Sequence, residues 1–198
     1  MTGRHSELPP GWLMTTMGDS FVWGSGGTPL RSVAGYYGGN IPWAVIGDLT
    51  DGLVGRTARS ITTSGIANSS AKWVPEGSVL LAMYGSIGKL GLTTVPLTTN
   101  QAIAFTTTDP INARFLLFQL MAARSALIDA GKGGTQSNIS QAVIKAFPFI
   151  LAPLPEQGRI VSAIESYLSR LDDAVANLEG VKRNLKRYRA SVLKAAVD

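Results

Sequence analysis

The chain has 198 residues, with 18 Lys or Arg, 13 Asp or Glu and a formal net charge of +5 at pH 7. It contains no cysteine and a single histidine, His5, so disulfide frameworks, thiolate metal sites and catalysis through a histidine base lack the residues that they need. No basic-then-apolar signal pattern opens the chain, and no apolar run approaches the roughly 18 residues of a membrane span. These features favour a cytoplasmic protein without membrane contact, and the modest basic excess permits an anionic partner.

From residue 13 to residue 105, short runs of β-branched, aliphatic and aromatic residues alternate with Gly, Pro, Asn and Asp. This pattern is typical of many short strands joined by loops. The strongest strand candidates are 45–46, 78–83, 90–95 and 102–107. We expect the four tryptophans to pack mainly in the core; they are Trp12, Trp23, Trp43 and Trp73.

A helix is predicted next. Asp109 can cap it, Pro110 suits its first position, and Gly131 can end it in a left-handed conformation. A second extended segment, 146–152, then leads out of the domain. The sequence therefore predicts a compact α/β unit over residues 1–153.

The rest of the chain, 154–198, reads as a helical region. Twenty of the 22 glycines and all ten prolines precede Glu156, and 43 residues without a proline follow. A continuous helix over 156–198 is about 60 Å long, several times the average helix of a globular protein, so it needs a partner.

Apolar residues mark the side of this helix that meets the partner. From Ile164 to Leu178 they follow one another at steps of four, three, four and three residues, which is the spacing of a coiled coil. A strict heptad then puts Lys182 and Arg189 in the core, whereas a shift of one residue restores an apolar seam and makes Gly180 the expected place of a bend. The predicted seam consists of Ile164, Leu168, Leu171, Val175, Leu178, Val181, Leu185, Tyr188 and Val192.

The segment from Gly85 to Leu90 lacks the spacing of a phosphate-binding loop, because Met83 stands where a glycine is needed and Leu90 where Ser or Thr is needed. A turn between two strands explains its glycines, with Tyr84, Ser86 and Lys89 displayed at the tip. Display on a loop is what a protein that reads DNA requires.

Direct base readout uses Arg for guanine and Asn or Gln for adenine, and phosphate contacts set the register. Further candidates for these roles are loop and strand-edge side chains: Arg31, Arg56, Arg59, Lys72, Lys132, Gln136 and Asn138. A solvated surface role is an equally good interpretation for each of them. For the loop at 133–138, a turn that bonds to its own backbone is the better one.

Several motifs occur in a fixed order. They are Leu8-Pro-Pro-Gly-Trp12, Gly18-Asp19, Gly26-Gly-Thr-Pro29, Ile41-Pro-Trp43, Asn100-Gln101, Gly133-Gly-Thr-Gln-Ser-Asn138, Pro153-Leu-Pro-Glu-Gln157 and Arg187-Tyr-Arg-x-Ser-Val-Leu-Lys-Ala-Ala196. In this order the chain resembles the specificity subunit of type I restriction-modification enzymes over nearly its whole length. Members of that family usually carry two recognition domains and two long helices, and this chain has one of each. Two origins stay open: a natural half-subunit, or a fragment of a longer chain.

The resemblance implies a target recognition domain followed by a conserved long helix, in a bacterial or archaeal protein without catalysis of its own. It implies double-stranded DNA, methyltransferase (modification) subunits and a restriction subunit as partners. S-adenosylmethionine and ATP are expected only on those partner subunits, and no cofactor or metal on this chain. Two antiparallel copies of the helix then form a homodimer that sets the spacer of a bipartite target, so deleting one turn within 162–178 should change that spacer.

Two other classes remain as alternatives. One is a coiled-coil scaffold whose front domain binds a protein or a carbohydrate; such a protein has no salt-dependent affinity for DNA. The other is an enzyme acting on a phosphate or nucleotide, which a nucleotide-binding assay would reveal.

Overall fold

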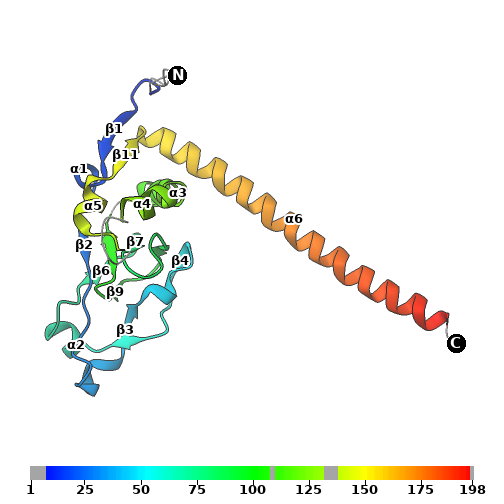
Figure 1. Ribbon diagram of the computed structural model, residues 1–198, viewed down its shortest axis with the longest axis horizontal. Coiled ribbons are helices and arrows are strands. Elements are labelled where there is room, and N and C mark those ends of the chain that lie inside the picture. The colour runs from blue at the N-terminus through cyan, green and yellow to red at the C-terminus, as the bar shows by residue number, and fades with distance from the viewer. Residues whose placement is uncertain (1–7, 108–109, 132–137, 197–198) are drawn as a thin grey trace. The chain divides into compact units, whose positions relative to one another are not determined.

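The computed structural model describes residues 8–107, 110–131 and 138–196. The chain divides into two compact units, Met1–Gln157 and Gly158–Asp198. The first is a mixed α/β domain, and the second contains most of a long helix that ends at Ala195 (Figure 1). This is the predicted fold class.

Two sheets form the centre of the α/β domain. A five-stranded sheet has the order β2 (Trp23–Ser25), β10 (Ile103–Thr106), β7 (Val79–Ala82), β8 (Leu90–Thr93) and β4 (Gly52–Val54). A four-stranded sheet has the order β5 (Ser60–Ile61), β3 (Tyr37–Ala44), β9 (Leu97–Thr99) and β6 (Trp73–Val74). Neighbouring strands are antiparallel except for the pairs β4/β8 and β3/β9, which are parallel.

One hydrophobic core joins the two sheets. Ala44 and Leu97 of the four-stranded sheet belong to the same buried cluster as Leu80 and Ile103 of the five-stranded sheet, and all four are fully buried. Burying these side chains stabilises the fold by about 25 cal/mol for each Å² of apolar surface removed from water. Trp43 belongs to a second buried cluster. Two short helices lie nearby, η1 (Ala34–Tyr36) and α2 (Thr63–Ala67).

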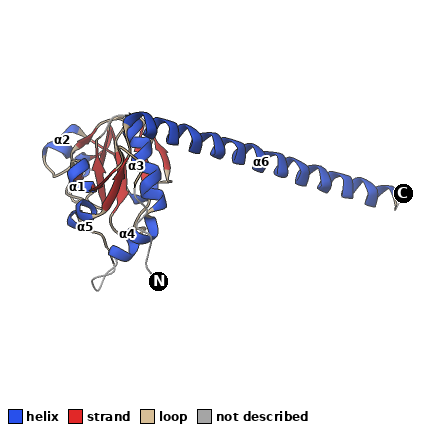
Figure 2. Ribbon diagram, turned by 90° about the horizontal axis from the view of Figure 1, so that it is seen from above, coloured by secondary structure: helices blue, strands red, loops and turns tan. Residues whose placement is uncertain are grey.

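Helices cover the other side of the five-stranded sheet. Helix α3 (Pro110–Ala122) contacts β7 and β8, lies against the strands in Figure 2, and is apolar around most of its circumference, as a buried helix is. A two-stranded sheet of β1 (Leu13–Thr16) and β11 (Pro148–Leu151) packs on α3 through the edge-to-face rings of Phe115 and Phe149. Helices α1 (Met17–Ser20) and α5 (Gln141–Ala146) contact each other beside it.

The predicted strands 78–83, 90–95 and 102–107 are confirmed as β7, β8 and β10. The predicted strand at 45–46 is wrong: β3 ends at Ala44, Val45 is the N-cap of the 3-10 helix η2 (Ile46–Asp48), and the Asp48 carboxylate accepts a hydrogen bond from Val45 N. Trp23 and Trp43 are buried as expected, but Trp12 is only half-buried. Trp73 is 53% exposed because it lies on the edge strand β6.

The predicted helix over 110–131 consists of two helices. Helix α3 ends at Ala122, and α4 (Arg124–Ala130) follows after Ala123, whose φ of −85° and ψ of 3° interrupt the helical geometry. Gly131 has a φ of −84°, so the predicted left-handed end is wrong. The predicted cap Asp109 lies outside the described residues. In the extended segment predicted for 146–152, Ala146 still belongs to α5, and β11 begins at Pro148.

The long helix α6 spans Leu154–Ala195 and thus begins two residues earlier than predicted. Pro155 fits in its first turn, where the backbone N–H groups have no helical acceptor. In the described residues, no helix is both long and apolar enough to cross a membrane.

Candidate DNA interface

Three sequence motifs of the first domain meet at the junction of the two sheets. The Trp43 indole Nε1 donates to Gly27 O at 3.0 Å, the Thr28 hydroxyl is hydrogen-bonded to Gln101 Oε1, and Asn100 N donates to Ala44 O at 3.0 Å. A methyl group on Gly26 would lie 2.0 Å from Thr99 O, so only glycine permits this approach. These motifs hold the sheets together.

Two other motifs meet where α6 begins. Gly11 has a φ of +83°, and a methyl group there would lie 3.2 Å from Pro153 Cγ. The Gln157 side chain is 2% exposed and donates from Nε2 to Ala152 O at 2.7 Å. The Pro-Leu-Pro-Glu-Gln motif therefore fixes the end of β11 and the first turn of α6.

Arg56 and Arg59 lie on one surface depression of about 310 Å³. Its lining consists of Gly39, Asn40, Pro42, Gly55, Arg56, Thr57, Ala58, Arg59 and Ser60. Both arginines are exposed, as is Asn40 on β3 of the four-stranded sheet. Two cations and an amide at one open depression form the chemistry that a nucleic acid needs.

Tyr84 and Asn138 are brought together by an antiparallel β-bridge, which is reinforced by a hydrogen bond from Ile139 N to Met83 O at 2.9 Å. Tyr84 and Ser86 are exposed on the turn between β7 and β8, and Lys89 is half-buried. The turn has its shape because Gly85 and Gly88 adopt φ values of +62° and +80°. Lys132 and Gln136 lie outside the described residues.

The short helix η2 lies between these two groups. A methyl group on Gly85 would be 3.9 Å from Ile46 Cδ1, and Asp48 Oδ1 of the same helix accepts from Ala58 N at 2.9 Å. The arginine depression and the tyrosine turn thus flank one short element, although 25 or more residues separate them in sequence.

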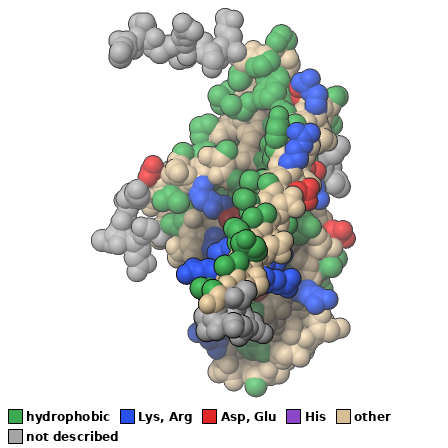
Figure 3. Space-filling model, turned by 90° about the vertical axis from the view of Figure 1, so that its right-hand side faces the viewer, with side chains coloured by type: hydrophobic (Ala, Val, Ile, Leu, Met, Phe, Trp, Pro, Cys, Tyr) green, Lys and Arg blue, Asp and Glu red, His purple; other side chains and the backbone are tan. Residues whose placement is uncertain are grey.

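Lys72 and Arg31 do not join either group. Lys72 precedes β6, which is the edge of the four-stranded sheet opposite to β5 and the depression. Arg31 is exposed in a turn after Pro29. On the face that Figure 3 shows, Lys and Arg side chains are scattered among apolar and uncharged ones.

Sequence reasoning missed Asn40 and the two residues that frame the depression, Asp48 and Thr57. The signal for Asn40 is the pair Gly38-Gly39 before it: Gly38 has a φ of +75°, and the pairing of β3 with β5 shifts register between Tyr37 and Ile41. Such a bulge re-aims a side chain at the edge of a sheet.

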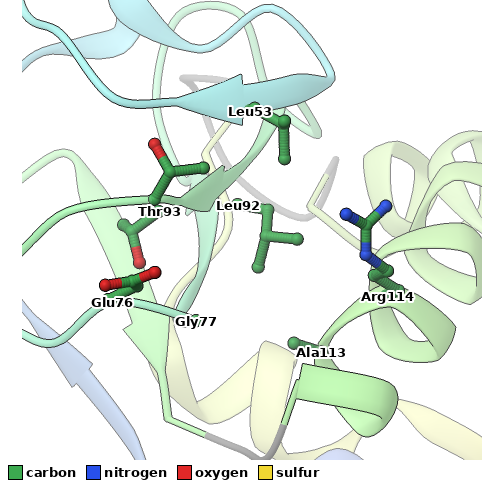
Figure 4. Close-up of a pocket in the computed structure, with 8 residues that line it drawn as sticks. Leu53, Glu76, Gly77, Leu92, Thr93, Ala113 and Arg114 are labelled. Carbon is green, nitrogen blue, oxygen red and sulfur yellow. The ribbon is translucent and has the colours of Figure 1, made fainter.

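A pocket of about 410 Å³ in the first domain is lined by residues of β4, β8 and α3 and of the turn before β7. Figure 4 shows Leu92 in its middle, with Glu76 on one side and Arg114 of α3 on the other. Its lining is mostly apolar. Among the described residues there is no group of three or more His, Cys, Asp or Glu side chains that could hold a metal ion.

The apolar seam predicted on α6 is present as an exposed row. From Leu168 to Val192 its residues are 45% to 69% exposed, and Ile164 is half-buried. Charges divide along the same helix: four acidic and two basic residues occur in Leu154–Ala174, and one acidic and six basic residues in the remainder up to Ala195.

Known proteins with similar sequences are specificity subunits of type I restriction enzymes. The specificity subunit of the type I restriction enzyme MjaIX from Methanocaldococcus jannaschii is 26% identical over 194 residues, which are 95% of this chain and 44% of that protein. The EcoR124I/EcoR124II specificity subunit from Escherichia coli is 27% identical over 181 residues, 86% of this chain and 44% of its own length. The chain thus spans less than half the length of these relatives.

Solved structures share the fold. One from a study of type I R-M assembly and conformational transition has a TM-score of 0.73 at 21% identity, over 94% of this chain and 45% of that one. The HsdS subunit from Thermoanaerobacter tengcongensis has a TM-score of 0.66 at 20% identity, over 86% and 41%. A family model described as Type I restriction modification DNA specificity domain matches residues 9–187. The chain therefore belongs to the type I restriction modification DNA specificity family.

Proposed function

We propose that this chain is a DNA sequence-recognition subunit that directs methyltransferase and restriction subunits to a bipartite DNA target. The observation that supports this most is the family match over 9–187, which includes both the α/β domain and most of α6. The chain recognises DNA without catalysis of its own and acts in the cytoplasm, where chromosomal DNA is accessible. S-adenosylmethionine and ATP bind to the partner subunits.

The proposed homodimer forms through two antiparallel copies of α6. The midpoint of α6 falls between Ala174 and Val175. Residues at equal distances on either side of it are both members of the apolar row: Leu171 and Leu178, Leu168 and Val181, Ile164 and Leu185. Antiparallel copies that overlap fully therefore match six of the nine seam residues with one another, whereas Val175 comes opposite Ala174, Tyr188 opposite Val161 and Val192 opposite Gln157. The one-residue shift near Gly180 places Val181, rather than Lys182, in the row and so opposite Leu168.

The charges favour this direction over a parallel pair. A parallel pair places the basic half of α6 beside the same basic half of the second copy, whereas an antiparallel pair places it beside the acidic half. Glu165 and Asp172 immediately follow seam residues, as do Lys182 and Arg189. In the antiparallel register, Glu165 comes beside Lys182 and Arg189 of the second copy, and Asp172 beside its Lys182. Charges flanking a coiled-coil seam set partner choice and orientation.

Methylation mapping tests the function. Long-read sequencing compares DNA from cells that express the chain together with the methyltransferase subunit encoded beside it and DNA from cells with that subunit alone. A two-part adenine motif that requires the chain is the expected result, and a palindromic motif supports two identical recognition domains. If both proteins are soluble and associated but no new motif appears, this chain alone does not specify a target.

The scaffold alternative makes the opposite prediction for DNA binding. A DNA reader loses affinity steeply as salt rises, because bound cations release counterions from the phosphates. A duplex affinity that is absent at low salt, in a chain whose helix still self-associates, would favour the scaffold.

A further inference from the structure

The depression that carries Arg56 and Arg59 is built on a fixed backbone. The Thr57 hydroxyl accepts from Trp43 N at 3.1 Å and donates to Arg59 O at 2.6 Å, and Trp43 N also donates to Arg59 O at 3.0 Å. Asp48 Oδ1 accepts from Ala58 N at 2.9 Å. Because Trp43 is itself buried, these bonds tie the loop between β4 and β5 to the core of the domain.

The two arginine side chains are not neutralised within the domain. In the part of the chain that the structure describes, neither guanidinium makes a side-chain hydrogen bond or ion pair. The nearby carboxylate of Asp48 is engaged on both oxygens by backbone N–H groups, of Val45 at 2.8 Å and of Ala58. Two exposed cations with free donors therefore line one depression.

The shape of the depression indicates which part of DNA it fits. Phosphates protrude from a duplex, whereas the base edges lie at the floor of the grooves and are reached by elements that project from the protein. A depression with two arginines thus suits a phosphate, which a guanidinium binds through two parallel hydrogen bonds. The exposed turn with Tyr84 and Ser86, on the other side of η2, is the projecting element of this region.

We propose that the depression formed by Gly39, Asn40 and the loop 55–60 anchors one backbone phosphate of the DNA, held by Arg56 and Arg59. Asn40 supplies an amide donor to the same phosphate. The site fixes the position of the domain on the duplex, and the turn at 84–86 is thereby presented to the groove. This inference rests on the proposed DNA-recognition function.

The test measures salt dependence with the full-length chain. Anisotropy titrations use a labelled duplex of random sequence at several NaCl concentrations, with wild type, the double variant Arg56→Gln/Arg59→Gln and the control Lys145→Gln, an exposed cation on α5. Loss of one phosphate contact reduces the slope of log K against log salt by about 0.9, and weakens binding roughly eightfold at 0.1 M salt. The control should retain the wild-type slope.

A second measurement separates anchoring from base readout. The methylated motif of the double variant, expressed with the methyltransferase subunit, should be the wild-type motif at reduced occupancy. A motif altered at a base, or a wild-type slope in the double variant, would overturn the phosphate assignment while leaving the DNA function intact. If the wild-type chain shows no salt-dependent duplex binding, both the DNA-recognition function and the phosphate anchor are contradicted.

Inorganic phosphate in solution offers the depression the same chemical group as a DNA phosphate, so a further titration distinguishes the two. Sodium phosphate replaces NaCl at equal ionic strength in the titration. Duplex affinity is expected to stay the same, since the depression is open and holds one phosphate of a polymer. If phosphate weakens duplex binding by wild type but not by the double variant, free phosphate competes with the duplex for the depression, which supports the contact between the depression and a DNA phosphate.

Discussion

Asp51 connects three parts of the first domain through one residue. It has a φ of +63°, accepts from Leu90 N through Oδ1 at 2.9 Å, and pairs the same oxygen with Arg124 Nη2 of α4 at 2.6 Å. Asp and Asn tolerate this left-handed backbone better than other residues with a side chain. The residue is thus suited to hold the start of β8 and α4 against the turn that precedes β4.

Replacing Asp51 by Ala removes both bonds and keeps the unfavourable backbone conformation. We expect Asp51→Ala to lower the free energy of unfolding by about 1–3 kcal/mol, and Asp51→Asn to lower it by less, because Asn tolerates the backbone and can still accept from Leu90 N. Urea unfolding of the two variants beside wild type measures the difference. Equal losses of unfolding free energy in the Ala and Asn variants would mean that Asp51 stabilises the fold only through its ion pair with Arg124.

Gly26 is the second residue where backbone geometry decides the outcome. A methyl group there overlaps Thr99 O of β9, so the two sheets must move apart to accept it. Gly26→Ala should cost about 3 kcal/mol or more. Gly35→Ala is the matched control, since a methyl group on Gly35 has no neighbour within 4 Å. Thermal unfolding of both variants checks the contrast, and a similar loss in both would show that the sheet junction is not the cause.

At the scale of elements, the sequence predicted those that local patterns determine. The strands at 78–83, 90–95 and 102–107 are apolar runs bounded by turns, and α6 has a long periodic row. β3 was missed because Gly38, Gly39 and Pro42 interrupt its pattern, although the bulge accommodates them. The convergence of Arg56, Arg59 and Asn40 depends on bonds from Thr57 and Asp48 to residues ten or more positions away, and no local pattern contains those pairings. The candidate site could be predicted only as separate cations.

The charge pattern of α6 leads to a prediction on self-association. The double variant Glu165→Lys/Asp172→Lys places cations beside Lys182 and Arg189 of the second copy. The dissociation constant of the dimer should therefore rise about tenfold, which corresponds to a loss of about 1.4 kcal/mol of association free energy. Adding Lys182→Glu and Arg189→Glu to the same chain restores opposite charges and should restore the dimer. Sedimentation equilibrium at 0.1 M salt measures both. Failure of the fourfold variant to recover would exclude the antiparallel register described above.

At the scale of the whole molecule, the symmetric seam makes it possible to shorten α6 without destroying the pairing. Deleting residues 165–171 removes one heptad and brings Val175 to the position after Ile164 that Leu168 held. The part of the row from Ile164 to Leu185, which keeps Val175, Leu178 and Val181, is then symmetric about Leu178. Asp172 takes the place of Glu165 directly after Ile164, so the flanking charge is kept as well.

If α6 sets the distance between two recognition domains, this deletion must change the spacer of the target and not its half-sites. Seven residues at 1.5 Å each shorten an antiparallel pair by about 10 Å, or roughly three base pairs at 3.4 Å per step. Methylation mapping should therefore show both half-sites unchanged and a spacer about three base pairs shorter. Deleting only residues 165–167 puts the two halves of the row out of register, and its expected result is loss of association. A shortened dimer that still methylates the original spacer would show that α6 joins the two domains without measuring the distance between them.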